Sequence, residues 1–248
     1  MDTVARWSVA VSITILFIGK GVVQHTPLDW AAKASDRYLV YPDQAYGFFS
    51  GTSLKLDVWQ AQTKDPVPTV IYTAATIAFW GNRTGALPYL MPWLARGWNV
   101  VNVEYRMSGT ALAPAAVKDI RCALRWAYRN AKQFHLDIDR IIATGNRREA
   151  ISRSWPGMLT EDAGLDKNCP SDPNYAEPPF KVAAVVAWYG PTDVGDLLSG
   201  LDRKTYVISW LGSLPDQATH ESVRLRIQLG KTRIFHRRCC LMVAYVEE

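Results

Sequence analysis

The stretch with the clearest chemical meaning is an apolar run that ends in a turn. Arg140–Thr144 is rich in β-branched residues and leads into Gly145 and Asn146. A sharp strand-to-helix turn of the pattern Gly-x-Ser-x-Gly lifts a serine hydroxyl above the end of a sheet, where it can attack a carbonyl carbon. Gly145 fills the first glycine position, but Arg147 fills the serine position and Glu149 the last glycine position. The pattern predicts a scaffold for acyl transfer without its nucleophile.

A serine of this kind works with a histidine that an acid orients. The chain has His220 and His236 downstream of the turn, and neither lies in a glycine-flanked loop. His25 and His135 lie upstream. We therefore expect no acid–histidine pair, and each downstream histidine is better explained as a surface residue.

Strands and helices alternate around this turn. The periodicity predicts strands over residues 54–59, 69–73, 98–105 and 182–190, and helices over 87–96 and 115–134. Gly97 ends the first helix, and Asp137–Asp139 forms a turn before the strand that reaches Gly145. This alternation predicts an α/β fold, with a mostly parallel central sheet and helices on both faces.

Three short runs carry a family resemblance. They are Val103–Arg106, Ala113–Asp119 and Ala123–Trp126. Together they resemble the esterase/lipase branch of the α/β-hydrolases, which includes hormone-sensitive-lipase-like and feruloyl-esterase-like carboxylesterases. The resemblance extends from about Leu54 to Leu214. It implies hydrolysis of a small-molecule ester by a Ser-His-Asp triad, with no cofactor and no metal.

The same resemblance implies an oxyanion loop after the second strand. The family has His-Gly-Gly-Gly there, and this chain has Ala74, Ala75 and Thr76. Backbone N–H groups supply the oxyanion donors, each worth roughly a factor of 100 to 1,000 in rate. Alanine retains the N–H but resists the positive φ angles that glycine allows. Trp80 begins a Trp-Gly-Asn-Arg run that fits the family.

Some further side chains have two interpretations. Phe79, Trp80 and Trp188 either line a substrate pocket or belong to the core, and aromatic residues are more often core. Asp193 follows the strand that contains Trp188, so it either lines the pocket or caps a helix over residues 194–198.

The charged residues after the turn are unsuited to a helix packed behind a nucleophile. One choice of codons for Arg147–Trp155, read two bases further on, spells Ala-Gly-Gly-His-Leu-Ala-Leu-Met. The two leftover bases, CG, complete a serine codon if a T precedes them. The hidden frame restores the serine, both glycines and an apolar helix together. We hypothesise a compensated frameshift, and the alternative is a divergent loop.

The C-terminal part departs from the family after Leu214. The family continues with an apolar strand, an aspartate-bearing turn and a final histidine, whereas Arg224–Arg238 is basic. One strand is expected to include Ile234, Leu241, Val243 and Val246. We expect a C-terminally truncated domain with an uncovered sheet edge.

The N-terminal part contains the uncharged, mostly apolar run Trp7–Gly19. It is short for a membrane span and suits the apolar region of an export signal, with Ala32–Ala34 as a candidate cleavage site. We expect residues 1–35 to be a signal peptide or anchor and residues 36–248 to be the hydrolase-like domain, best supported over 54–214. The predicted location is secreted, periplasmic or membrane-anchored, with N-terminal membrane association. A buried N-terminal helix is the alternative.

Cysteine placement is compatible with export. Cys122 lies on a predicted helix and Cys169 in a Pro-, Asp- and Asn-rich loop, so a Cys122–Cys169 disulfide is one hypothesis and two free thiols the other. The adjacent Cys239 and Cys240 match no metal-ligand spacing.

The composition of the chain limits the classes of binding partner that we expect. The chain of 248 residues carries a net charge of +5, but no basic helix, zinc-finger spacing or RNA-binding signature accompanies that charge. We expect no nucleic-acid partner. The predicted function is a serine-type ester hydrolase by resemblance, inactive as written. The alternatives are a catalytically dead binding protein on the same scaffold, and an enzyme that uses Ser152 or Ser154.

Overall fold

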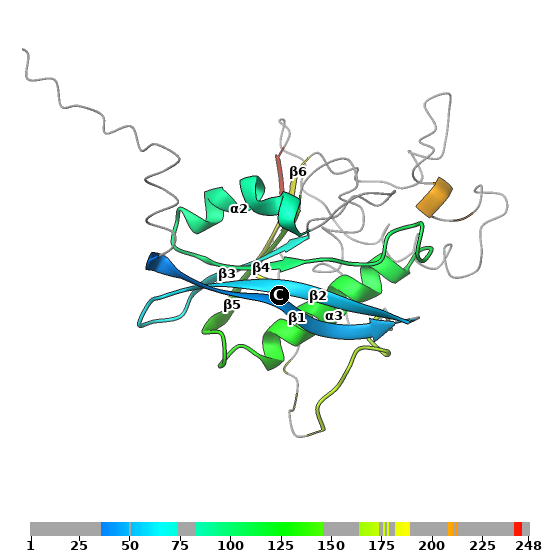
Figure 1. The fold of residues 1–248 in the computed structure, drawn as a ribbon, viewed down its shortest axis with the longest axis horizontal. Coiled ribbons are helices and arrows are strands. Elements are labelled where there is room, and N and C mark those ends of the chain that lie inside the picture. Colours follow the sequence, from blue (N-terminus) through cyan, green and yellow to red (C-terminus); the bar gives the residue numbers. More distant parts are fainter. Residues whose placement is uncertain are drawn as a thin grey trace, which may run out of the picture.

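The computed structural model describes residues 36–49, 51–73, 83–145, 164–173, 176, 178, 182–188, 208–210, 212 and 241–244. Its elements, in chain order, are β1 (Tyr38–Phe49), β2 (Thr52–Ala61), β3 (Val67–Thr73), the short 3₁₀ helix η1 (Thr84–Ala86), α2 (Leu87–Leu94), β4 (Asn99–Val103), α3 (Ala115–Arg129), β5 (Leu136–Gly145), β6 (Ala184–Trp188) and β7 (Leu241–Ala244). Figure 1 shows these elements arranged as one twisted sheet with helices packed against it.

The strands form a single sheet in the order β1-β2-β4-β3-β5-β6-β7. The four central strands β4, β3, β5 and β6 are parallel to one another. β1 and β2 are antiparallel at one side, and β7 is antiparallel to β6 at the other. The predicted α/β class is confirmed, and the sheet is parallel at its centre and antiparallel towards both sides.

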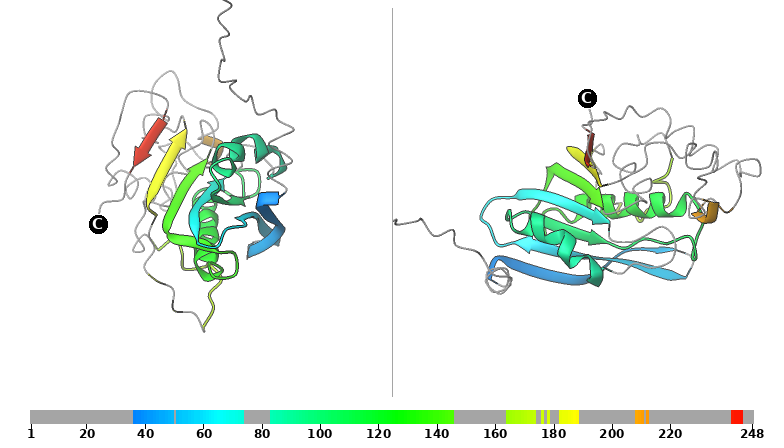
Figure 2. Two further views of the ribbon diagram at one scale, coloured as in Figure 1. Left: turned by 90° about the vertical axis from the view of Figure 1, so that its left-hand side faces the viewer. Right: turned by 90° about the horizontal axis from the view of Figure 1, so that it is seen from above.

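Helices cover both faces of the sheet, as predicted. α3 packs in a cluster with Ile71 and Val101, whereas α2 packs in a separate cluster with Val70 and Val100. Successive residues of a strand point to opposite faces, so these neighbouring pairs place α2 and α3 on opposite sides of the sheet. The two further views in Figure 2 show the sheet between the helices.

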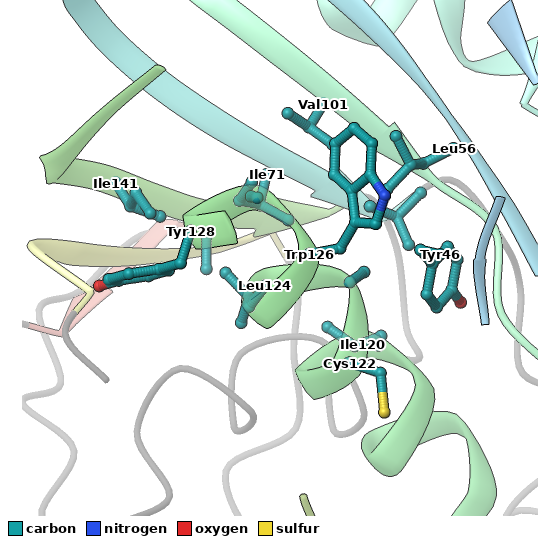
Figure 3. Packing of buried hydrophobic residues seen from close by; sticks show 14 of the residues in the cluster. Tyr46, Leu56, Ile71, Val101, Ile120, Cys122, Leu124, Trp126, Tyr128 and Ile141 are labelled. Carbon is teal, nitrogen blue, oxygen red and sulfur yellow. The ribbon is translucent and has the colours of Figure 1, made fainter. Parts of the chain in front are cut away.

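The larger cluster lies under α3. Figure 3 shows Trp126 of α3 beside the strand residues Leu56 and Val101, and Leu124 and Ile71 belong to the same cluster. Leu56 and Leu124 are 0% exposed. Burying a side chain of this size is worth roughly 1.5–3 kcal/mol, so α3 is held mainly by its apolar face.

Several element boundaries differ from the sequence prediction, two of them by several residues. The turn predicted at Asp137–Asp139 lies inside β5, where the pairing with β3 shifts register between Pro68 and Thr69. The Asp137 carboxylate accepts the backbone N–H groups of Asp139 and Arg140, as in a local turn, while the strand continues through it. The second predicted helix ends at Arg129 rather than at residue 134.

β1 was not predicted from the sequence. It is the outermost strand on its side, and Leu39, Val40 and Phe48 are exposed. Its alternation is interrupted by Pro42 and Asp43, because Asp43 has a φ of 56° and the register with β2 shifts there. A bulge of this kind also protects a sheet edge from further pairing.

Among the described residues, none of the helices has the length and apolar character needed to cross a membrane.

Candidate functional site

The parallel strands end together at one edge of the sheet. Thr73 at the end of β3 is the register partner of both Val103 of β4 and Gly145 of β5. Gly145 is in turn the partner of Ala187 of β6. In open α/β sheets, ligands bind outside the carboxyl ends of the strands. This carboxyl edge, defined by Thr73, Val103, Gly145 and Ala187, is the candidate functional site.

Buried threonine hydroxyls connect three of these strands. The Thr73 hydroxyl donates to the carbonyl oxygen of Thr144 at 3.4 Å, and the Thr144 hydroxyl donates to the carbonyl oxygen of Val186 at 2.8 Å. Both threonines are 2% exposed, so an unpaired hydroxyl would be costly. These bonds hold the ends of β3, β5 and β6 in a fixed relation immediately below the edge.

Two of the expected site residues, Gly145 and Trp188, lie at the ends of described strands. Gly145 is the last residue of β5, between β3 and β6. Trp188 is the last residue of β6, and only its backbone is described. The remaining predicted site residues lie outside the described residues: Asn146, Arg147, Glu149, Ala74, Ala75, Thr76, Phe79, Trp80 and Asp193.

The structure nevertheless pairs the two residues that come just before the expected segments. Thr73 directly precedes the expected oxyanion slot in the chain, and Gly145 directly precedes the rest of the expected nucleophile turn. Because Thr73 and Gly145 are register partners, both segments start from neighbouring strands at the same edge. A carbonyl-binding loop and a nucleophile turn need this relation.

The one histidine in the described part of the chain lies away from this edge. The backbone oxygen of His135 accepts a hydrogen bond from the side-chain amide of Asn99, the first residue of β4. His135 also directly precedes β5. It therefore lies at the amino edge of the parallel strands, opposite the candidate site, and its position excludes a role as a general base there.

An ion cluster around Arg83 borders the carboxyl edge and was not found from the sequence. The Arg83 guanidinium donates to Glu104 through Nε at 3.0 Å, to Asp43 through Nη2 at 2.7 Å, and to Asp57 through Nη1. Its backbone oxygen accepts the side-chain amide of Asn102 at 2.9 Å. The cluster thus ties β1, β2 and the end of β4 to the residue that precedes η1.

The charges of this cluster shift its pKa values. Burial works to lower the pKa of Arg83, but the hydrogen bonds to Asp43 and Glu104 and the charge of Asp57 raise it overall. The hydrogen bond from Arg83, followed by the charge of Lys55, lowers the pKa of Asp43. Both directions favour the charged forms of Arg83 and Asp43.

A second ion pair fixes the loop that follows β4. Asp119 on α3 is 0% exposed and accepts Nε and Nη2 of Arg106 at 2.9 and 2.7 Å, and the backbone N–H of Arg106 at 2.9 Å. Burial raises the pKa of Asp119 against the opposing hydrogen bonds from Arg106. The hydrogen bonds to Asp119 raise the pKa of Arg106. Arg106 and Asp119 both belong to the runs that carry the family resemblance. The structure shows that the two residues form an ion pair.

Tyr46 completes the support of the same loop. Its hydroxyl donates to the backbone oxygen of Glu104 at 2.5 Å. Burial, followed by the charges of Asp119 and Glu104, raises the pKa of Tyr46 well above its ordinary value. Further along the loop, the backbone N–H of Ala113 donates to the oxygen of Trp210, which is 1% exposed. The loop after β4 is thus held from below by α3, from the side by β1 and from the far end by Trp210.

The expected pairing of Cys122 and Cys169 is present in the structure. The two residues form a disulfide with a Cα–Cα distance of 5.0 Å and a sequence separation of 47. It links α3 to the connection between β5 and β6. Within the described ranges, no group of three His, Cys, Asp or Glu side chains is arranged to hold a metal ion.

Two curated proteins are similar to this chain in sequence. Esterase LipC of Mycobacterium tuberculosis (strain ATCC 25618 / H37Rv) is 32% identical over 150 residues, which are 57% of this chain and 34% of that protein. Esterase LipQ of the same strain is 28% identical over 145 residues, or 56% of this chain and 32% of that protein. The chain spans about a third of the length of these curated relatives.

Two solved esterase structures share the fold. Esterase B from Lactobacillus rhamnosis superposes with a TM-score of 0.60 at 18% identity, covering 81% of this chain and 67% of that chain. Esterase LipW from Mycobacterium marinum superposes with a TM-score of 0.55 at 18% identity, covering 79% and 60%. At this level of identity, the likeness establishes the architecture rather than the chemistry.

A family model gives the assignment. The model described as BD-FAE matches residues 56–225, which is more than half of the chain and runs from within β2 through β6. This range contains the carboxyl edge and the Arg106–Asp119 pair described above. The chain therefore belongs to the BD-FAE family, in the esterase and lipase branch of the α/β-hydrolases.

Proposed function

We propose that this chain is an esterase-type scaffold that binds a small-molecule ester at the carboxyl edge and, as written, does not turn it over by a serine triad. The observation that supports the proposal is the register of Thr73 with Gly145, because the two expected carbonyl-recognition segments follow these residues in the chain. Arg147 occupies the nucleophile position, and a guanidinium cannot act as a nucleophile in its charged form.

The binding half of the proposal is tested by titrating an unreactive ketone isostere of an aryl acetate into the labelled protein. Backbone amide signals of Thr73, Glu104 and Gly145, at the carboxyl edge, are expected to shift. Signals of Asn99 and Leu136, at the opposite edge, serve as the matched control and are expected to stay. Equal shifts at both edges, or none at either, contradict ester binding at this site.

The catalytic half is tested separately with an aryl acetate and a serine-directed fluorophosphonate. We expect no turnover above the uncatalysed rate and no covalent adduct in the intact mass, because the chain offers no serine in the turn. Ester hydrolysis that the fluorophosphonate abolishes would show a working serine nucleophile and overturn this part.

The residues after Gly145 support a second proposal about the gene. The BD-FAE match runs through the charged segment, and the alternate reading frame would restore serine and both glycines there. An independent read of the gene through codons 70–80, 145–156 and past the stop tests it. If the alternate frame returns with a downstream Asp and His, the protein is an ordinary serine esterase; if the codons stand, the non-catalytic function stands.

We also propose that the protein is exported or anchored by its N-terminal segment. The apolar run Trp7–Gly19 supports this location, and so does the Cys122–Cys169 disulfide, since disulfides persist in oxidising compartments. Fractionation of the producing cells, with immunodetection in the cytosol, membrane and medium, tests the location. Recovery of the protein only in the cytosol contradicts it.

A further inference from the structure

One face of α3 carries two cations and the sulfur of Cys122 side by side. Arg121 and Arg125 are four residues apart, and Cys122 and Arg125 are three apart. Residues with these spacings lie next to one another on a helix surface. The helix therefore presents both guanidinium groups on the surface from which Cys122 forms its disulfide.

The segment that crosses this face is a tight turn. The backbone N–H of Cys169 donates to the oxygen of Asp166 at 2.9 Å, which closes a turn over 166–169. The Asp166 carboxylate accepts Nη2 of Arg121 at 2.7 Å and Nε of Arg125 at 3.0 Å, and it also accepts Nε of Arg121. One turn thus binds the two cations with its first residue and the thiol with its last.

Burial makes these contacts strong. The side chains of Arg121, Asp166 and Arg125 are 0%, 9% and 16% exposed. Charges this far from water need partners, because an unpaired buried ion is severely penalised. Leu165, the preceding residue, is also buried at 7% exposure. The ion contacts of Asp166 and the burial of Leu165 therefore favour packing of the turn against α3 independently of the disulfide.

We propose that Asp166 is a positioning residue for disulfide formation, which docks the 166–169 turn on Arg121 and Arg125 and so holds Cys169 against Cys122 before the bond forms. The oxidant is a small disulfide such as glutathione disulfide. The half-buried Cys169 thiolate attacks it, forming a mixed disulfide and releasing one glutathione thiolate. The buried Cys122 thiolate then attacks the Cys169 sulfur and releases the second.

Docking also gives the reaction its selectivity. The chain has four cysteines, and Cys239 and Cys240, which lie outside the described residues, offer alternative partners in any oxidising refolding mixture. A contact that holds two groups together raises their effective concentration relative to competitors in the same chain. The ion contact therefore directs Cys169 to Cys122 because it restricts where the turn can be.

The first experiment measures the thiol–disulfide equilibrium of the full chain in glutathione redox buffers. For Asp166→Asn, we expect the effective concentration of the Cys122–Cys169 pair to fall about tenfold, within the range of 5- to 150-fold typical of coupling between two contacts. Arg125→Met should give a smaller fall, because Arg121 keeps its bonds to Asp166. Asp65→Asn, which removes an exposed charge elsewhere, should match the wild type.

A stability control separates positioning from general destabilisation. Ile141→Val weakens the core on β5, away from the ion contact. For this variant, the shift in the redox equilibrium divided by the loss in unfolding free energy measures the effect of destabilisation alone. The proposal is overturned if the same ratio for Asp166→Asn is no larger.

The second experiment maps the disulfides after oxidative refolding. Peptide mass analysis should show Cys169 paired with Cys239 or Cys240 in Asp166→Asn more often than in Ile141→Val. Equal pairing patterns in the two variants contradict the selectivity. This readout needs no folded reduced state, so a variant that folds poorly still gives an answer.

Discussion

At the scale of single residues, the described part of the site is organised by buried ions rather than by catalytic groups. Asp119 fixes the loop after β4 by binding Arg106 through three hydrogen bonds. Arg106 also lies over the ring of Phe49, 4.9 Å from its centroid. The pair thus connects α3, the loop and the end of β1.

Replacing Asp119 with alanine should destabilise the protein by about 3–5 kcal/mol, because it leaves a largely buried guanidinium without its partner. Urea unfolding followed by circular dichroism measures the change. Asp139→Ala, at an exposed position, is the control and should stay within about 0.5 kcal/mol of the wild type. A loss at Asp119 below about 1 kcal/mol would mean that the pair contributes little net stability.

Tyr38 predicts a pH dependence at the alkaline end. Its hydroxyl contacts the backbone oxygens of Leu94 at 2.8 Å and Trp98 at 3.1 Å, and burial raises the pKa of Tyr38 to about 12. The unfolded state, with an ordinary tyrosine pKa near 10, releases the proton first. Stability from Tyr38 is therefore complete below pH 10 and declines as the pH rises towards 12.

Tyr38→Phe tests this dependence by urea unfolding at pH 8 and pH 11. At pH 8 the variant should be about 1 kcal/mol less stable than the wild type, because it lacks the hydrogen bond. At pH 11 this difference should shrink, since only the wild type loses the contribution of Tyr38. A difference that stays constant across the two pH values would contradict the raised pKa.

At the scale of elements, the end of α2 shows how local sequence sets a boundary. Gly97 has a φ of 77°, and its N–H donates to the oxygen of Leu94. The N–H of Trp98 reaches the oxygen of Trp93, and the two tryptophan rings stack 5.7 Å apart. This is the Schellman arrangement with its apolar contact, and it turns the chain from α2 into β4.

Gly97→Ala should cost about 1–2 kcal/mol, because an alanine Cβ is disfavoured at positive φ. A Cβ at Gly97 would meet nothing within 4 Å, so the cost is conformational rather than steric. Gly109→Ala is the matched control, since that site is equally open and has no positive φ, and it should be near neutral. Thermal unfolding measures the melting temperature of both variants. Equal decreases in the two variants would contradict a conformational cause for the cost at Gly97.

At the scale of the whole molecule, the disulfide joins parts that are distant in sequence. It closes a segment of 47 residues that contains β5 and most of the connection towards β6. Restricting an unfolded chain by a loop of this length is worth about 4 kcal/mol in the chain-entropy account. The carboxyl edge depends on β5 and β6 staying in register, so the crosslink supports the site from outside it.

Cys122→Ser combined with Cys169→Ser should lower the melting temperature by roughly 10 °C, because about 4 kcal/mol is lost in a chain of this size. Cys239→Ser is the control and should leave the melting temperature unchanged. Reduction of the wild type should reproduce the double variant. If the reduced wild type has the same melting temperature as the oxidised protein, the disulfide does not stabilise the fold.

Local pattern was sufficient for most elements. Apolar runs predicted β2, β3, β4 and β6, and helical spacing predicted α2 and α3, because these segments bury one face or both. β1 was not predicted, because an exposed outer strand with Pro42 and Asp43 lacks a regular alternation of apolar and polar residues. The turn predicted at Asp137 was wrong, because β5 continues through this residue. An aspartate that accepts nearby backbone N–H groups has the same local sequence pattern in a turn and in an irregular strand.

By itself, the sequence determined the family, the α/β class and the strand that reaches Gly145, since these follow from local periodicity and short motifs. Only the tertiary structure decided which residues become partners. The Arg83 cluster joins residues from four segments, and Asp166 meets Arg121 across the fold. Charged residues carry no local pattern that names their partners, because an ion pair depends on distance in space and on burial, and the folded sheet sets both.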